Sequence, residues 1–307
     1  MHKVTAGYYA DIVRETIRII AHNLDTALDL TALAAAARLS PFHFHRLFRG
    51  MTGETPLGMH RRLRLERAAL ALQSTARPVT DVAFEAGYET HEAFTRAFRA
   101  AYACPPSQFR DGIHHRATGV AGHFRTQLAA RTGVHYSTNA TCAPNFHTTT
   151  GESTMNVEIR HLPAVRLATV SHIGPYNRIV DAFGRLGAIA GPAGLIGPDS
   201  AMIAIYYDDP ESTPAEALRA DAGFSVPDDA QLPANLEARL LPAGRYACTV
   251  HAGSYATLGD TWARFLGEWL PRSGSRLRDS VSFERYLNTP MDAADEDLRT
   301  ELFILLD

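Results

Sequence analysis

A helix with two chemically different faces is predicted by the sequence Ser40-Pro-Phe-His-Phe-His-Arg-Leu-Phe-Arg49. Ser40 can cap this helix, and Pro41 suits its first turn. Its apolar residues recur at helical spacing and form one face: Phe44, Leu47 and Phe48. Another face carries Phe42, His45, Arg46 and Arg49, and this face is basic and can form hydrogen bonds. We expect the apolar face to be buried and the basic face to point outward.

The same pattern returns fifty residues later and predicts a second helix of this kind. Its apolar stripe carries Phe94, Ala97 and Phe98, and its outward face carries Glu92, Thr95, Arg96 and Arg99. A shorter helix precedes each copy, marked by small apolar residues within 33–39 and 82–88. The second turn is one residue longer and contains Gly87, and glycine adopts positive φ easily. Two such helix pairs predict an all-α, duplicated helix-turn-helix that binds DNA.

Length and composition favour a two-domain globular protein, with 307 residues of which 46% are hydrophobic and 21% charged. No apolar run approaches the roughly 18 residues of a membrane helix, and the N-terminus lacks the apolar core of a secretion signal. We therefore expect a cytoplasmic protein with no membrane partner. Its three cysteines are far apart and predict neither a disulfide framework nor a zinc site.

Charge is divided unevenly between the two halves. Residues 1–115 hold 14 Lys and Arg against 11 Asp and Glu, whereas residues 156–307 hold 13 against 21. The first half is therefore the better candidate for contact with DNA phosphates. A long helix over about residues 57–72 is expected to join the two helix-turn-helix units. Its four arginines, which could contact phosphates or form salt bridges, are Arg61, Arg62, Arg64 and Arg67.

Residues 8–110 resemble the DNA-binding domain of the AraC/XylS family of bacterial transcription regulators. The matching motifs are Leu63-x-Leu65-x-Arg67-Ala68, Val82-Ala83-x-x-x-Gly87-Tyr88, Phe94-x-Arg96-x-Phe98 and Pro105-Pro106-Ser107-x-Phe109-Arg110. The resemblance implies two recognition helices that enter successive major-groove segments of promoter or operator DNA. The base readers it implies are Phe42, His45 and Arg46, then Glu92, Thr95 and Arg96, with His43 and His91 as weaker candidates. It also makes RNA polymerase a candidate partner.

Residues 116–154 lose periodicity and predict a linker, with one helical turn at about 124–131. The histidines of this stretch have no metal-ligand spacing, so no metal site is expected. We therefore predict three parts: a DNA-binding domain over 1–115, the linker over 116–154, and a second domain over 155–307.

The second domain contains a repeat with a period of 79 to 80 residues, in which 166–176 matches 245–255. Each copy is expected to form a strand, a His-x-Gly-x-Tyr turn, a helix and two further strands. The helices are placed at about 176–190 and 255–270. Two such β-α-β-β repeats predict an α+β domain with a pseudo-twofold cleft.

Strand alternation in this domain places one carboxylate among aromatic residues. Glu284 and Tyr286 share a face of their strand, and Ala204 and Tyr206 are expected on the same side of the sheet. The opposite side is expected to be the core under the helices, with Ile203, Ile205 and Phe283. Glu284 would then be a polar point in an aromatic cleft. The alternative is a surface glutamate on an exposed sheet face.

Residues 155–307 resemble the GyrI-like effector-binding domain, through the motifs His172-x-Gly174-x-Tyr176, His251-x-Gly253-x-Tyr255 and Phe283-Glu284-x-Tyr286. The resemblance implies a central pocket for a bulky aromatic or cationic molecule, with Glu284 as its carboxylate. The ligand-binding residues expected are Glu284, Tyr206, Tyr286, Tyr176, Tyr255 and Trp262. Some members of this domain family instead hydrolyse strained cyclopropane compounds, a use that fusion to a DNA-binding domain disfavours.

The function predicted is therefore a DNA-binding transcription regulator controlled by a small molecule. It would be no enzyme and would need no catalytic residue, cofactor or metal, with the histidines of the His-x-Gly-x-Tyr turns structural. Two alternatives remain open. The second domain could be a hydrolase or drug-sequestering protein tethered to DNA, or it could bind a protein partner.

Overall fold

The computed structural model describes residues 2–112, 126–137, 155–208, 210, 213–278 and 280–307. Within these ranges the chain forms two compact units. One unit comprises residues 2–9, 30–50 and 155–307, and the other comprises 10–29, 51–112 and 126–137. The helices at 30–50 thus belong to the same compact unit as the C-terminal half, a grouping that the predicted domain boundaries did not contain. Those boundaries stay a prediction.

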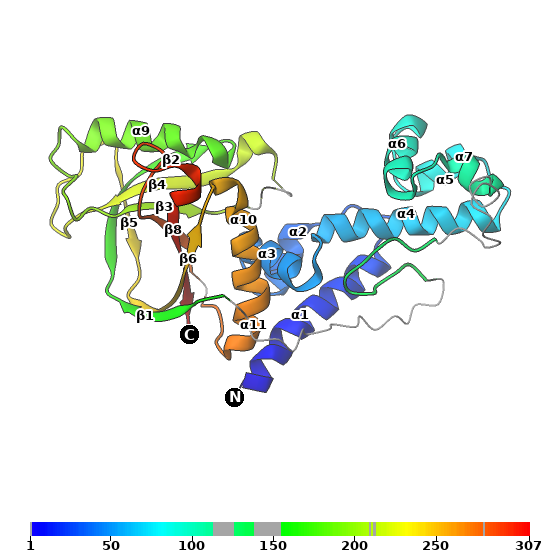
Figure 1. Ribbon diagram of the computed structural model, residues 1–307, viewed down its shortest axis with the longest axis horizontal. Coiled ribbons are helices and arrows are strands. Elements are labelled where there is room, and N and C mark those ends of the chain that lie inside the picture. The colour runs from blue at the N-terminus through cyan, green and yellow to red at the C-terminus, as the bar shows by residue number, and fades with distance from the viewer. Residues whose placement is uncertain (1, 113–125, 138–154, 209, 211–212, 279) are drawn as a thin grey trace. The chain divides into compact units, whose positions relative to one another are not determined.

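The N-terminal part is helical, as expected (Figure 1). Its helices are α1 (His2–His22), α2 (Leu30–Ala36), α3 (Pro41–Thr52), α4 (Pro56–Ser74), α5 (Val79–Glu85), α6 (His91–Tyr102) and α7 (Pro106–Asp111). The side chains of Ser40 and Thr90 cap the predicted recognition helices, because they accept hydrogen bonds from the backbone N–H groups of His43 and Ala93. Gly87 has φ +76°, so the longer second turn uses the left-handed backbone that the sequence predicted.

Helices α4 to α7 share one apolar core. Phe94 and Phe98 of α6 are fully buried and meet Phe109 of α7 and Leu65 and Leu72 of α4. The stripe at i, i+4 in α6 therefore faces inward, and the opposite side of that helix is left toward solvent. This is the arrangement the sequence predicted for the second recognition helix.

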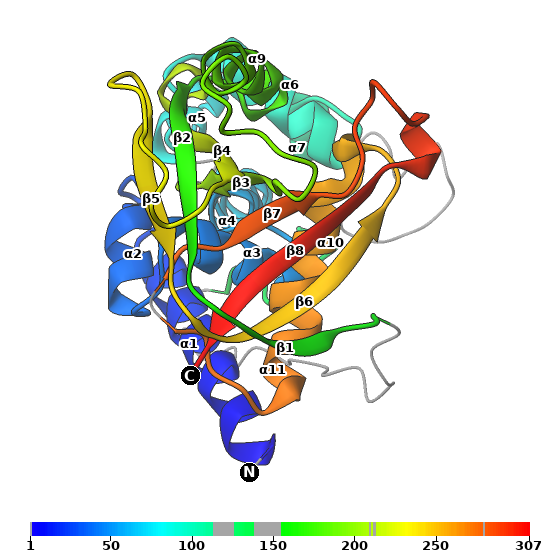
Figure 2. The same ribbon diagram turned by 90° about the vertical axis from the view of Figure 1, so that its left-hand side faces the viewer.

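The C-terminal half is a curled antiparallel sheet of eight strands with helices on one face (Figure 2). The strands are β1 (Glu158–Leu162), β2 (Val165–Ile173), β3 (Met202–Tyr206), β4 (Arg219–Ser225), β5 (Glu237–Leu241), β6 (Gly244–Ala252), β7 (Phe283–Tyr286) and β8 (Arg299–Leu306). Their order across the sheet is β1-β6-β8-β7-β3-β4-β2-β5. Strands β3 and β7 meet at the centre, where Ala204 pairs with Glu284.

Two helical segments follow the two His-x-Gly-x-Tyr turns. The first consists of a 3-10 turn η1 (Tyr176–Arg178) and helix α9 (Ile179–Ala190). The second consists of η3 (Tyr255–Thr257), α10 (Leu258–Arg264), the π-helical turn η4 (Phe265–Trp269) and α11 (Leu270–Ser273). Both segments begin and end close to the predicted ranges.

The prediction of which sheet face the helices cover is wrong. Helix α9 packs through Phe183 and Leu186 against the small residues Ala168, Ala204 and Ala222, which lie on the face of Glu284. The large residues Ile203, Ile205, Phe283, Phe303 and Leu305 form a separate core on the other face. Small side chains let a helix approach a sheet closely, and the curl of the sheet encloses the bulky ones.

The helical turn predicted at about 124–131 is not formed by its described residues, 126–131. These residues instead belong to an irregular segment that is anchored to helix α4. The backbone N–H groups of Leu128 and Tyr136 donate to the carboxylate of Glu66, at 2.8 Å each, and Arg62 donates to the backbone oxygen of Val134. The rest of the predicted linker, with His123 and His147, lies outside the described residues.

Candidate effector and DNA-contact sites

Glu284 lies at the centre of the sheet, and both its oxygens accept hydrogen bonds from aromatic side chains. Trp262 of α10 donates from Nε1 to Oε1 at 2.8 Å, and Tyr286 donates from its hydroxyl to Oε2 at 2.9 Å. The hydroxyl groups of Tyr206 and Tyr286 are 2.9 Å apart. Only 2% of Glu284 is exposed to solvent. Ala204 pairs with Glu284 as predicted, and Tyr206 and Tyr286 share its side of the sheet. The alternative of an exposed surface glutamate is wrong.

The environment of Glu284 disfavours an uncompensated negative charge. Burial raises the pKa of this carboxyl, and the hydrogen bonds from Trp262 and Tyr286, together with the positive charge of Arg46, act in the opposite direction. Burial, together with the charge of Glu284, also holds the pKa values of Tyr206 and Tyr286 well above their usual range. Both hydroxyls consequently stay protonated and keep a donor for the carboxylate or for a ligand.

The other predicted ligand residues surround this group. The ring of Tyr176 lies edge-on to that of Tyr206 with centroids 4.7 Å apart, and Tyr255 lies edge-on to Tyr286 at 5.5 Å. Tyr255 is 36% exposed, whereas Trp262 is buried at 1%. The structure thus brings the five predicted aromatic residues together around the carboxylate of Glu284, with Tyr255 at the edge of the group.

The histidines of the two turns brace the backbone that carries Tyr176 and Tyr255. His172 hydrogen-bonds through Nε2 to the backbone oxygen of Pro175 at 3.1 Å, and His251 hydrogen-bonds in the same way to Ser254 at 3.1 Å. These contacts close each turn locally. They fit the structural role expected of both histidines.

Helix α6, the predicted recognition helix of the second helix-turn-helix, presents its predicted reader face to solvent. Glu92, Arg96 and Arg99 are exposed and Thr95 is half-buried. None of the ion pairs found in the described part of the chain involves any of these four residues. The predicted reader face of α6 is therefore largely exposed.

The corresponding face of α3 is not exposed, and this expectation is wrong. Phe42 is 2% exposed and His45 is 6% exposed, while Arg46 and Arg49 are half-buried. The face packs against the C-terminal half, which belongs to the same compact unit. Sequence periodicity could not name this partner. The signal that could have suggested it is the run of four rings at 42–45, because a helix that is ring-bearing on more than one face tends to be buried on more than one face.

The arginines of α4 divide between the two roles considered for them. Arg62 is buried and donates to the carboxylates of Glu54 and Glu66, at 2.7 and 3.1 Å, and Arg67 pairs with Asp25 at 2.7 Å. These two are structural ion pairs. Arg61 is exposed, and Arg64 is half-buried.

Two family models match the chain and together span most of it. A model of the GyrI-like small molecule binding domain matches residues 155–307, and a model of a helix-turn-helix domain matches residues 33–112. The DNA gyrase inhibitor of Erwinia billingiae is 32% identical over 154 residues, which are 49% of this chain and 96% of that protein. The chain belongs to the AraC/XylS family and carries a GyrI-like domain.

A further relative is matched over a smaller share of its length. The right origin-binding protein of Escherichia coli is 34% identical over 111 residues, which are 36% of this chain and 38% of that protein. The chain therefore matches little more than a third of that relative's length. The EcmrR chain, solved in complex with DNA, aligns over 50% of this chain and 57% of its own with 15% identity and a TM-score of 0.44.

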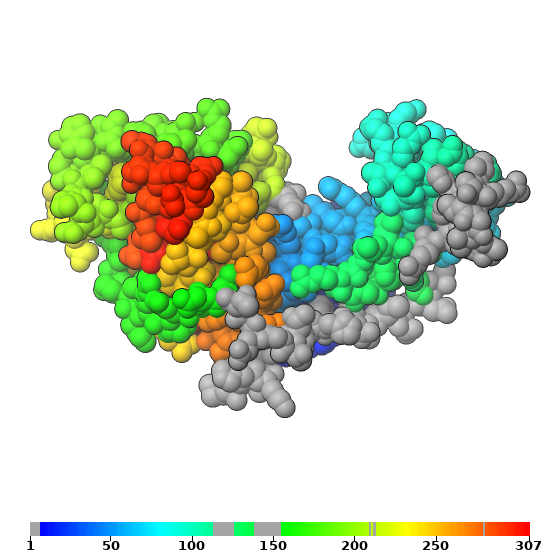
Figure 3. Space-filling model, viewed as in Figure 1, coloured from blue at the N-terminus to red at the C-terminus, as the bar shows by residue number. Residues whose placement is uncertain are grey.

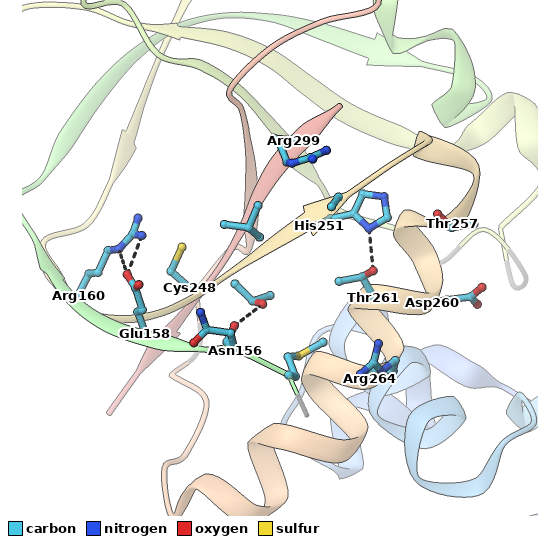
Figure 4. A pocket seen from close by; sticks show the side chains of 14 residues that line it. Asn156, Glu158, Arg160, Cys248, His251, Thr257, Asp260, Thr261, Arg264 and Arg299 are labelled. Carbon is cyan, nitrogen blue, oxygen red and sulfur yellow. Dashed lines mark hydrogen bonds and ion pairs between the residues drawn. The ribbon is translucent and has the colours of Figure 1, made fainter. Parts of the chain in front are cut away.

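The GyrI-like domain also has a cavity of about 590 Å³ that Glu284 does not line (Figure 4). It lies over β1, β6 and α10, and its walls include Glu158, Arg160, His251, Asp260 and Arg264. Arg160 is already paired with Glu158 at 2.8 Å and with Glu301 at 2.7 Å. The charges of this cavity are thus partly satisfied within the protein.

Two negative findings hold for the residues that the structure describes. They contain no group of three or more His, Cys, Asp or Glu side chains placed to hold a metal ion. None of the helices among them is long and apolar enough to cross a membrane.

Proposed function

We propose that this AraC/XylS-family chain is a sequence-specific DNA-binding transcription regulator whose GyrI-like domain binds an aromatic cation at Glu284. The observation that carries the proposal is the buried carboxylate of Glu284, which lies among five aromatic side chains in a chain that also has an exposed recognition helix. An effector bound at one site would change the affinity of the other for DNA. RNA polymerase would be the partner through which the bound regulator acts.

The DNA-contact role rests on α6 and on its counterpart α3. Arg96 and Arg99 are exposed on α6, and an arginine can donate two hydrogen bonds to the O6 and N7 atoms of guanine. Thr95 and Glu92 lie on the same face and would contact neighbouring bases or sugars. On α3 the equivalent set is Phe42, His45, Arg46 and Arg49.

The effector role rests on the physical demands of Glu284. A carboxylate taken out of water is stable only when a cation or several donors compensate it, and a ligand cation within about 6 Å of an aromatic ring is attracted to the ring face. Tyr206, Tyr286 and Trp262 supply donors and ring surface at once. The cleft would lie between two related β-α-β-β halves, and only one half has the carboxylate, because its partner position is Ala204.

A binding role is favoured over hydrolysis by the way Glu284 is held. Trp262 and Tyr286 donate to the two carboxylate oxygens, which fixes the orientation of the group and stabilises its ionised form, the form that would attract a cation. We therefore assign Glu284 an electrostatic task and give the chain no catalytic residue. The proposed domains are 1–115 for DNA, 116–154 as linker, and 155–307 for the effector.

The test uses the full chain and DNA from upstream of its own gene. A gel shift should reveal a specific complex whose affinity falls steeply with salt, because counterions are released from the duplex. The probe for the effector site is 1-methylquinolinium, a flat aromatic cation, and its addition should change the DNA affinity. A chain that forms no salt-sensitive specific complex, with or without the probe, would remove the proposal.

A further inference from the structure

Helix α3 lies beside α10 of the C-terminal half (Figures 1 and 3). Residues of its predicted reader face make part of this contact. His43 hydrogen-bonds through Nε2 to Ser282 Oγ at 2.5 Å, in a buried position. The ring of Phe42 lies edge-on to the indole of Trp262 with centroids 5.3 Å apart. Arg49 pairs with Asp260 of α10 at 2.8 Å. Three side chains of α3 are thus engaged by the C-terminal half, two of them by α10 and one by Ser282, the residue before β7.

The approach of α3 to α10 is close enough to require a glycine. A Cβ atom added to Gly50 would overlap the backbone oxygen of Ala263 and would lie 2.6 Å from the Cα atom of Gly267. Gly267 belongs to the π-helical turn η4, a feature often found at functional sites. The contact is therefore a packed helix crossing, held by backbone proximity as well as by side chains.

The chemistry of the contact matches the chemistry proposed for the effector. The guanidinium carbon of Arg46 lies 3.7 Å from the centroid of the Phe42 ring, so the helix carries a cation stacked on an aromatic group. Phe42 touches Trp262, and Trp262 donates to Glu284. The positive charge of Arg46 also stabilises the ionised form of Glu284, which burial disfavours. The helix thus offers Glu284 the compensation that an aromatic cation would offer.

We infer that α3 is an internal occupant of the effector site, so that an aromatic cation pairing with Glu284 displaces α3 and frees its reader face for DNA. This inference rests on the proposed function and adds to it the sign of regulation, because the effector increases DNA affinity. The contrast with α6 supports it: the equivalent face of that helix is exposed, whereas Phe42 and His45 are 2% and 6% exposed. One helix of the pair is withheld while the other stays available.

Energetic coupling follows from the shared surface. If only a fraction of chains has α3 released, the apparent DNA association constant is the intrinsic one multiplied by that fraction, and a ligand that favours the released state restores it. Linkage then requires DNA to tighten effector binding by the same factor. Coupling between the DNA-reading face of α3 and the effector site does not require a long chain of intervening residues. Trp262 alone contacts both the reader Phe42 and the anchor Glu284.

The experiment compares two glycine variants in the full chain. Gly50→Ala adds a methyl group that the docked state cannot accommodate, whereas Gly184→Ala adds one in α9 with no atom within 4 Å. Both changes favour a helix. Without probe, Gly50→Ala should bind its upstream DNA about tenfold more tightly than wild type and should no longer respond to 1-methylquinolinium. Gly184→Ala should behave as wild type in both respects.

A second readout follows the docked contact itself. The chain has two tryptophans, so Trp269→Phe leaves Trp262 as the only indole, and release of α3 should shift its emission to longer wavelength. The shift is expected with Gly50→Ala, with the probe and with DNA. Ser282→Ala, which removes the partner of His43 without altering α3, should give part of it.

The outcomes separate the two proposals. A wild-type chain that binds no DNA specifically would remove the proposed function, and the inference with it. A chain that binds DNA, but whose Gly50→Ala and Gly184→Ala variants share the wild-type affinity and Trp262 emission, would overturn only the docking of α3. A probe that weakens DNA binding would overturn the sign of the regulation.

Discussion

Glu284 and Ala204 face one another across the central pair of strands, and only one of them carries charge. The carboxylate is tied to α10 through Trp262 and to its own strand through Tyr286. A residue required only to maintain the sheet could be apolar here, as its counterpart is. The retained buried charge therefore indicates a task that needs electrostatics.

The change Glu284→Gln tests this task, because it keeps the shape of the side chain and one acceptor oxygen for Trp262 and removes the charge. The amide NH2 group would then donate to the hydroxyl oxygen of Tyr286, which can act as an acceptor. The variant should bind 1-methylquinolinium roughly tenfold more weakly, the order of one charge-assisted bond. It should bind 4-methylquinoline, which is uncharged at neutral pH and similar in shape, almost as well as wild type does. Calorimetric titration of both compounds measures the difference, and equal losses would give Glu284 a structural role.

The same residue predicts how cation binding depends on pH. Burial raises the pKa of Glu284, so this carboxyl takes up a proton at a higher pH than an ordinary glutamate does. The ionised form, which attracts the cation, is present above that raised pKa and is lost as the pH falls through it. As the pH is lowered, affinity for 1-methylquinolinium should accordingly begin to fall at a pH above the usual pKa range of glutamate. The variant Glu284→Gln should show no such fall.

Residue-level reasoning from sequence succeeded where alternation alone decides the answer. The pairing of Ala204 with Glu284 and the shared side of Tyr206 and Tyr286 follow from the period of two in a strand and from the internal repeat. Alternation does not say which side a helix covers, because both sides of this sheet are apolar. Here the small residues face α9 and the bulky ones face the inside of the curl.

Helices α3 and α6 show how far an element can be predicted from its period. Both bury the stripe that the spacing indicated, Phe44 and Phe48 in one and Phe94 and Phe98 in the other. Their second faces differ, because α3 meets Trp262, Ser282 and Asp260. A contact between residues more than two hundred positions apart leaves no trace in local periodicity.

Substitution of the two equivalent arginines should therefore give unequal results. Arg96→Ala changes an exposed residue of α6, so it should leave the melting temperature near wild type and cost roughly 1–3 kcal/mol of specific DNA binding. Arg46→Ala removes a positive charge that favours the ionised form of Glu284 as well as the proposed DNA contact. It should alter the Trp262 emission of the free chain, which Arg96→Ala should not. Binding to specific and random duplexes, together with melting curves, would separate the DNA contact from the effect on the free chain. If the two variants changed DNA affinity, melting temperature and Trp262 emission alike, the different placement of their helices would be contradicted.

At the scale of the whole molecule, a cut at residue 115 would separate α4 from a segment that satisfies one of its buried charges. Glu66 is 2% exposed, and it accepts backbone hydrogen bonds from Leu128 and Tyr136 besides the ion pair with Arg62. Sequence composition assigned residues 126–137 to a linker because they lack periodicity. Their role in the fold lies in backbone donors, which every sequence has and no pattern reveals.

Two fragments test this contribution, one ending at residue 115 and the other at residue 137. The longer fragment should unfold at a higher denaturant concentration, by roughly 1.5–3 kcal/mol, because the shorter one leaves Glu66 without its charge-assisted backbone bonds. Glu66→Ala made in both fragments gives a double-mutant cycle. The substitution should cost much more in the longer fragment, where the carboxylate has its donors, than in the shorter one. Equal costs in the two fragments would mean that residues 126–137 stabilise α4 by packing alone, and equal stability of the unsubstituted fragments would mean that the segment does not hold to α4 in solution.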